Sequence, residues 1–175
     1  MPLLPNGTFK LEGATEEPLK VGDKALDFSR TNQNGEKVSL SDLAGTPVAI
    51  LLVSSATNDL TKERLTKFKR LSASLPGTTP IVLANDYFSR NKELAEAVGG
   101  IDFHILDDQS EGYEAIATYE QPTDTGTDYP LYLLSADHTI TSIKSGDEFL
   151  AQSDEEVIAS LTPVVRPTRP VRTAE

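Results

Sequence analysis

The chain has 175 residues, of which 38% are hydrophobic and 25% charged, and this composition is typical of a soluble globular protein with its own core. The formal net charge of −11 excludes a nucleic-acid binder of the usual kind, since contacts with phosphates need a basic face, and so acidic a surface repels anionic membranes. The chain has no cysteine and two histidines, which excludes disulfides, thiolate metal sites, a cysteine nucleophile and a multi-histidine metal cage.

The first residues, Met1 to Gly7, contain neither a basic start nor a long apolar stretch. We therefore expect a cytoplasmic protein without an export signal, and no run approaches the roughly 18–20 apolar residues of a membrane span. Alternating polar and apolar residues predict a short strand at Thr8 to Glu12. Asn34-Gly35 predicts a hairpin over Phe28 to Leu40, and one helical turn follows at Ser41 to Gly45.

Three continuous apolar runs predict strands that are buried on both faces. They are Pro47 to Val53, Pro80 to Ala84 and Leu131 to Leu134. Leucines at helical spacing predict a long helix from Leu60 to Leu75, with Asn58 or Asp59 as its N-cap and Pro76-Gly77 after it. Shorter helices are predicted at Ser89 to Val98, Tyr113 to Tyr119 and Asp154 to Leu161, the last capped by Ser153. The remaining predictions are a strand at Asp102 to Leu106, a polar loop at Thr123 to Asp128, and an antiparallel strand at Thr139 to Ile143 after the Asp137-His138 turn.

This order of elements predicts an α/β fold in which a mixed sheet carries helices on both faces. We expect one domain over residues 1–161 and a Pro/Arg-rich tail over residues 162–175. Removing the tail's three arginines and one glutamate leaves 13 basic and 26 acidic residues upstream, so the tail carries +2 and the remainder −13. A tail of this composition is either solvated or lies against an acidic surface of its own or a partner chain.

The segment from Val21 to Gly45 resembles the opening of a peroxiredoxin. Val21-Gly22-Asp23-Lys24-Ala25-Leu26-Asp27-Phe28 matches V-G-D-x-A-P-D-F except that Leu26 replaces the proline, and Val38-Ser39-Leu40-Ser41-Asp42-Leu43-Ala44-Gly45 matches V-S-L-S-D-F-x-G. The layout from Thr8 to Leu161 is similar to the thiol-peroxidase branch. This resemblance implies a thioredoxin-like mixed β-sheet flanked by helices, with an extra N-terminal β-hairpin at Thr8 to Glu12.

The resemblance also locates the family's reactive site, P-x-x-x-T-x-x-C, between the first buried strand and the long helix. Here Val53 stands for the proline, Thr57 is kept, and Leu60 replaces the peroxidatic cysteine. The family's arginine falls at Tyr129, and the resolving cysteine falls near Leu94 or Ala95. Because the family's reaction needs a thiolate, the resemblance implies a vestigial pocket. We expect Leu60 to pack on Tyr129 or Val53 and close it.

We therefore predict a peroxiredoxin-like protein that has lost its catalytic cysteines and acts in binding or regulation, with no cofactor and no metal. The resemblance implies a homodimer, since family members pair around the reactive helix, and another protein partner is the alternative. The alternative functions are the family's thiol-peroxidase or antioxidant oxidoreductase activity, and an enzyme that reuses the pocket. His104 with Asp107 and Asp108 is either a cation site or, as we expect, a surface histidine beside a solvated acidic turn. Pro130 stands where thioredoxin-like proteins often have a cis proline.

Overall fold

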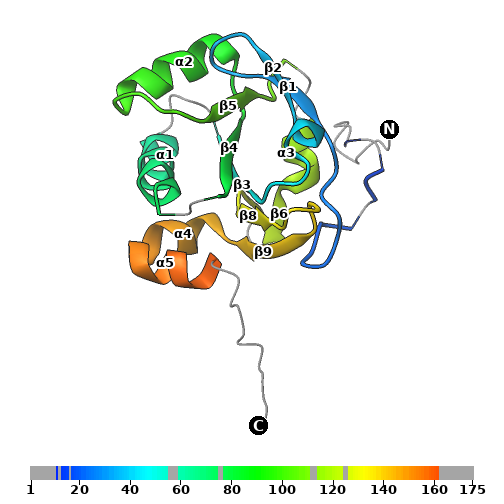
Figure 1. The fold of residues 1–175 in the computed structure, drawn as a ribbon. Helices are drawn as coiled ribbons and strands as arrows, with labels where there is room; N and C mark the ends of the chain where they lie inside the picture. Colours follow the sequence, from blue (N-terminus) through cyan, green and yellow to red (C-terminus); the bar gives the residue numbers. More distant parts are fainter. Residues whose placement is uncertain are drawn as a thin grey trace.

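The computed structural model describes residues 11–161 apart from residues 12, 16, 55–58, 75–76, 111–113 and 124–125. At its centre is a mixed sheet with the strand order β2-β1-β5-β4-β3-β8-β9 (Figure 1). The strands are β1 (Ser29–Thr31), β2 (Lys37–Ser39), β3 (Val48–Val53), β4 (Thr79–Ala84), β5 (His104–Asp107), β8 (Leu131–Leu134) and β9 (Ile140–Lys144). The predicted α/β fold with a mixed sheet is confirmed.

The middle of the sheet consists of three parallel strands, β3, β4 and β5, joined by helical crossovers. Helix α1 (Asp59–Ser72) connects β3 to β4, and helix α2 (Phe88–Ala97) leads from β4 to β5. All six residues of β3 are buried, which explains why this strand has no polar alternation in the sequence. Strand β8 lies antiparallel on the other side of β3 and pairs with β9.

Helices cover both faces of the sheet, as predicted (Figure 1). On one face α1 and α2 pack together with α4 (Gly146–Ala151) and α5 (Asp154–Leu161). On the other face lie α3 (Glu114–Tyr119) and the 3-10 turn η1 (Leu40–Leu43). The two apolar layers are separate clusters, built on alternate residues of the same strands; Leu51 and Val53 belong to the first, and Ile50 and Leu52 to the second.

The hairpin predicted from Asn34-Gly35 is present as β1 and β2, which pair antiparallel from Ser29↔Ser39 to Thr31↔Lys37. Gly35 has a φ of 84°, a left-handed conformation that side chains disfavour, and this is the physical reason why glycine marks the turn. The predicted helical turn is also present, as η1, and the chain leaves it through Gly45, whose φ is 91°.

Three local expectations need correction. The polar loop expected at Thr123 to Asp128 is instead part of a two-stranded ladder of β6 (Gln121–Thr123) and β7 (Gly126–Asp128). Helix α4 was not predicted, although Ser145 caps it by accepting a hydrogen bond from Glu148 N–H at 3.1 Å. Asp59 is the first residue of α1 and not its N-cap.

Several expectations fall outside the part of the chain that the structure describes. These are the tail at 162–175, Asn58 as the helix cap, Pro76, and the N-terminal hairpin at Thr8 to Glu12, of which Leu11 alone is described. Among the described residues, no helix has the length and apolar character needed to cross a membrane.

Candidate functional site

Two of the residues assigned to the vestigial pocket, Val53 and Tyr129, lie at the same end of the β3–β8 pair, but their side chains pack in different apolar clusters. Strands β3 and β8 pair with Leu51 opposite Leu131, and Leu52 N–H donates to the carbonyl of Pro130 at 3.2 Å. This register places Tyr129 beside Val53, at the edge where β3 ends. Val53 is completely buried, whereas Tyr129 is half-buried. Thr57 lies outside the described residues.

Leu60 does not close this edge, contrary to expectation, because its side chain is 50% exposed. It is the second residue of α1, and the helix turns a different set of residues inward: Thr61, Leu65 and Phe68 are all buried. These residues follow the four-three spacing of one helical face, and Leu60 is turned about 100° away from Thr61 in a helix with 3.6 residues per turn. In the first turn of α1, the side chain that points toward the core is therefore that of Thr61.

The hydroxyl of Thr61 connects the first turn of α1 to the end of β3. Its Oγ1 lies 3.1 Å from Oγ of Ser54, the residue that follows the strand. Asp59 places a carboxylate at the first residue of the same helix. A negative charge there is favourable for the helix dipole and unfavourable for an anion bound at the same end.

The guanidinium of Arg64 also lies at this edge, and the sequence analysis did not identify it. Arg64 is one helical turn beyond Leu60, and its Nη1 donates to the backbone carbonyl of Tyr129 at 3.4 Å. A Cβ atom on Gly146 would lie 2.4 Å from Nη2 of Arg64, so this glycine lets the guanidinium lie against the first residue of α4. Nε of Arg64 is buried and makes no hydrogen bond in the described part of the chain. No sequence signal separates Arg64 from the other basic residues of α1.

Leu94 and Ala95, the positions assigned to the resolving cysteine, are buried in α2. They belong to the apolar cluster that also contains Leu65 and Phe68 of α1. Both side chains are apolar, so they contribute packing and no redox chemistry. The Tyr129–Pro130 peptide bond is trans, so the cis proline of many thioredoxin-like proteins is not found at this position.

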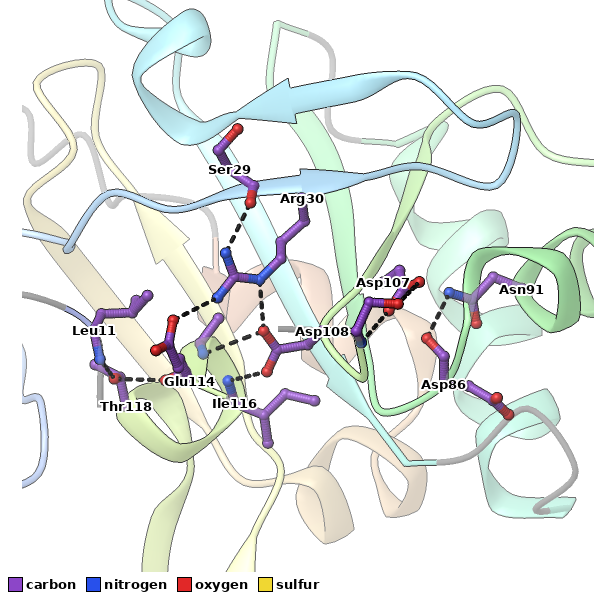
Figure 2. A network of polar contacts seen from close by, with 12 residues as sticks. Leu11, Ser29, Arg30, Asp86, Asn91, Asp107, Asp108, Glu114, Ile116 and Thr118 are labelled. Atoms are coloured by element: carbon purple, nitrogen blue, oxygen red, sulfur yellow. Dashed lines mark hydrogen bonds and ion pairs between the residues drawn. The ribbon is translucent and has the colours of Figure 1, made fainter. Parts of the chain in front are cut away.

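The acidic turn after β5 is buried, so its interpretation as a solvated turn is wrong. Asp107 is 2% exposed and accepts hydrogen bonds from Phe88 N–H at 3.0 Å and from Ser110 N–H at 2.8 Å, which ties α2 to β5. Asp108 is fully buried beside Arg30 (Figure 2). His104 is instead engaged by Asn32, whose Nδ2 lies 3.0 Å from its Nδ1. Within the described residues, no group of three or more histidine, aspartate or glutamate side chains is arranged to hold a metal ion.

Asp108 is the centre of a polar network that joins β1 to α3 (Figure 2). Its carboxylate accepts hydrogen bonds from Nε of Arg30 at 2.7 Å and from the backbone N–H of Ile116 at 2.8 Å. Burial raises the pKa of Asp108, and the bonds from Ile116 and Arg30 partly offset that rise. The network lies at the carboxyl end of β5, the same end of the parallel strands at which Leu60 lies, but on the face of the sheet that α3 covers.

Taken together, the parallel core of β3, β4 and β5, the antiparallel β8–β9 pair and the helix that begins after β3 define a thioredoxin-like α/β protein. Solved structures share this fold. The chain is similar to a peroxidoxin, BcpB, from Mycobacterium tuberculosis, with a TM-score of 0.67 and 18% identity over 85% of this chain and 99% of that one. It is also similar to a thiol peroxidase from Chromobacterium violaceum, with a TM-score of 0.63 and 15% identity over 79% of this chain and 85% of that one.

The chain belongs to the AhpC/TSA family, whose model matches residues 21–143. It is 32% identical over 85 residues to the thiol peroxidase of two Streptococcus pneumoniae strains, an alignment that covers 49% of this chain and 52% of the relatives. The chain thus spans about half the length of the curated relatives that it matches. The resemblance to peroxiredoxins of the thiol-peroxidase branch is confirmed, and the chain contains no cysteine.

Proposed function

We propose that this chain is a non-catalytic member of its family that serves as a binding or regulatory protein. The observation that carries the proposal is the absence of any cysteine from the chain, so that Leu60, at the position that the resemblance assigns to the peroxidatic cysteine, is no thiol and no other residue replaces it. In the family's reaction a thiolate attacks the O–O bond of the peroxide, and the sulfur becomes a sulfenic acid. Leu60 has neither a lone pair nor an ionisable proton and supports no such step.

The exposed side chains at the same edge of the sheet support a role in protein contact. Leu60 and Tyr87 are each 50% exposed and Phe88 is 44% exposed. Since β3 and β4 are parallel neighbours, α1 and α2 both begin at this edge, and the three residues form what we call the edge patch (Leu60, Tyr87 and Phe88). Apolar side chains gathered on a surface favour a protein partner. The partner proposed is a second copy of this chain.

The catalytic part of the proposal is tested by measuring peroxide consumption by the full chain in the presence of thioredoxin, thioredoxin reductase and NADPH. We expect the rate to equal that of a protein-free control, while a cysteine-bearing thiol peroxidase in the same assay consumes peroxide. Turnover above the protein-free rate would contradict the proposal and favour an enzyme that reuses the pocket.

The dimer is tested by sedimentation equilibrium over a concentration series. Tyr87→Lys puts a charge into the edge patch and is expected to raise the dissociation constant about tenfold or more, which corresponds to about 1.4 kcal/mol. Val21→Lys is the matched control, because Val21 is 58% exposed and lies away from this edge, beside β9. A wild-type chain that stays monomeric, or equal effects of the two variants, would rule out the edge patch as a dimer interface.

A cytoplasmic location is part of the same proposal. A chain without cysteine holds no disulfide, and this is compatible with a reducing compartment. Fractionation of cells that express the tagged full chain tests it, and recovery outside the cytoplasm would contradict it.

A further inference from the structure

A groove of about 700 Å³ lies at the opposite end of the sheet from the edge patch, between the end of α1 and the loop that leads into β5. Its apolar lining includes Ala73, Pro80 and Ile101. Asp102 contributes an exposed carboxylate, for which no ion pair is found among the described residues. We call this feature the β4 groove.

Two charged side chains line the β4 groove, Lys69 and Asp102. Nζ of Lys69 donates to the carbonyl of Val98 at 3.0 Å, at the end of α2. Lys69 and Arg70 also place two positive charges in the last turn of α1, where they offset the partial negative charge of the helix terminus. Asp102 is therefore the group of the lining that attracts a cation.

The C-terminal residues 162–175 have a sequence period that matches such a groove. Arg166, Arg169 and Arg172 recur at every third residue, and so do Val164, Pro167 and Pro170. A polyproline II helix has three residues per turn, so this pattern predicts one basic edge and one adjacent apolar edge. The apolar edge suits Ala73, Pro80 and Ile101, and the basic edge suits Asp102.

The segment has the length to reach the groove. Asp154, the first residue of α5, accepts a hydrogen bond at 2.7 Å from Nη2 of Arg70, which lies in the last turn of α1 close to Ala73. The eight residues of α5 span about 12 Å at about 1.5 Å per residue, so Leu161 lies within about 12 Å of the Arg70–Asp154 pair. Fourteen further residues extend about 43 Å at about 3.1 Å each. The covalent connection also gives the segment a high effective concentration at the groove.

We infer that residues 162–175 bind in the β4 groove of their own chain as a polyproline II segment. The inference is independent of the proposed function, since it concerns the end of the sheet remote from Leu60. The occupied groove would be covered by a basic strip, and this strip would offset part of the negative charge of the remaining chain.

Paramagnetic relaxation tests the inference in the full chain. Because the protein has no cysteine, Thr168→Cys accepts a single nitroxide label in the middle of the segment. We expect broadening of the backbone amide signals of Gly77, Thr78 and Ile101, which reduction of the nitroxide reverses. The amides of Leu60 and Tyr87, at the opposite end of the sheet, should stay sharp. Sharp signals at the groove, or broadening confined to the edge patch, would overturn the inference.

Two comparisons separate this occupant from others. Asp102→Lys is expected to lower the bound population roughly twofold to fivefold, the effect of removing one exposed ion pair, whereas Asp147→Lys makes the same change of charge on α4 and should leave the broadening unchanged. Raising the salt from about 0.1 M to about 1 M, which shortens the Debye length from about 10 Å to about 3 Å, should weaken binding as well. Equal effects of the two variants would contradict the inference.

A mixed sample tests whether the segment belongs to the same chain. An isotope-labelled chain without nitroxide is mixed with a spin-labelled chain without isotope. Unaffected groove signals in this mixture are expected and support binding within one chain. Broadening as strong as in the single-chain experiment would show that a second copy supplies the segment and would overturn the inference as stated.

Discussion

The side chain of Arg30 donates from Nε to the carboxylate of Asp108 at 2.7 Å, although the two residues are 78 positions apart in the chain. Both are buried, Arg30 being 5% exposed and Asp108 0% exposed. The guanidinium also donates to the carbonyl of Ser29 at 2.7 Å, and the carboxylate receives backbone N–H groups at the start of α3. This ion pair therefore connects the β1–β2 hairpin with the helix on the same face of the sheet (Figure 2).

Removal of one partner of this pair is expected to destabilise the fold strongly. Arg30→Met should lower the free energy of unfolding by about 3 to 5 kcal/mol, because it leaves the Asp108 carboxylate buried without its cation. Denaturant titration measures the change. Lys20→Met is the control, since it breaks the exposed Lys20–Asp23 pair and should change the free energy by less than about 1 kcal/mol. A similar loss in both variants would contradict a special role for the buried pair.

Tyr119 is expected to make the fold sensitive to alkali. Its Oη donates to the carbonyl of Leu26 at 2.7 Å, and burial raises the pKa of this phenol well above its ordinary value. The folded state therefore keeps the proton where the unfolded chain loses it. The corresponding stability is complete below about pH 10 and is lost above it, by about 1.4 kcal/mol per pH unit.

Tyr119→Phe tests this prediction. The variant should flatten the fall of the unfolding free energy above about pH 10, and near neutral pH it should lose about 1 kcal/mol with the hydrogen bond to Leu26. Tyr87→Phe is the control, because half of Tyr87 is exposed. An alkaline slope in Tyr119→Phe that equals that of the wild type would refute the assignment.

Arg64 and Gly146 are expected to be energetically coupled. In Gly146→Ala the new methyl group meets the guanidinium of Arg64 and should displace it from Tyr129, at a loss of about 1 to 3 kcal/mol. In an Arg64→Ala background the same change should be nearly neutral. A double-mutant cycle on unfolding free energies is expected to give a coupling of about 1 kcal/mol or more. Additive effects would mean that the two residues do not interact in solution.

His138 occupies the left-handed region with a φ of 63°, and its Nε2 lies 3.1 Å from the carbonyl of Leu43. His138→Ala keeps the unfavourable backbone conformation and loses the side-chain contact, so we expect a loss of about 1 kcal/mol. His138→Gly loses the same contact but relieves about 1 kcal/mol of backbone strain and should be nearly neutral. Thermal unfolding of both variants measures the difference, and a glycine variant less stable than the alanine variant would disprove this explanation.

Leu60→Cys is expected to restore a reactive thiol without restoring turnover. The exposed position should react with a maleimide and with peroxide, since a cysteine there is accessible. The sulfenic acid then needs a second thiol, and the positions assigned to the resolving cysteine hold Leu94 and Ala95 in the core. Mass spectrometry after peroxide treatment identifies the oxidised sulfur, with Leu60→Ser as the control without a thiol. Sustained peroxide consumption with thioredoxin would contradict the prediction.

Local patterns predicted most of the regular structure. The unbroken apolar run at Pro47 to Val53 corresponds to the fully buried β3, and Asn34-Gly35 corresponds to the β1–β2 hairpin. The misses are short elements. The β6–β7 ladder has three residues in each strand, and α4 has six residues, so neither has a long enough period to be recognised before its packing is known.

At the candidate site, too, some features could be predicted from the sequence and others could not. The chemistry that is missing at position 60 is a property of the residue itself, because a leucine has no sulfur in any fold. The amino-acid sequence alone therefore determined that the chain has no cysteine to supply the thiolate of the family's redox step. Three features of the site depend on the elements that pack around it. They are the direction of the Leu60 side chain, the cation that lies beside Tyr129, and the burial of Asp108. Only the tertiary structure decided these points, since Arg64 meets α4, and Arg30 meets Asp108, across parts of the chain that are far apart in sequence.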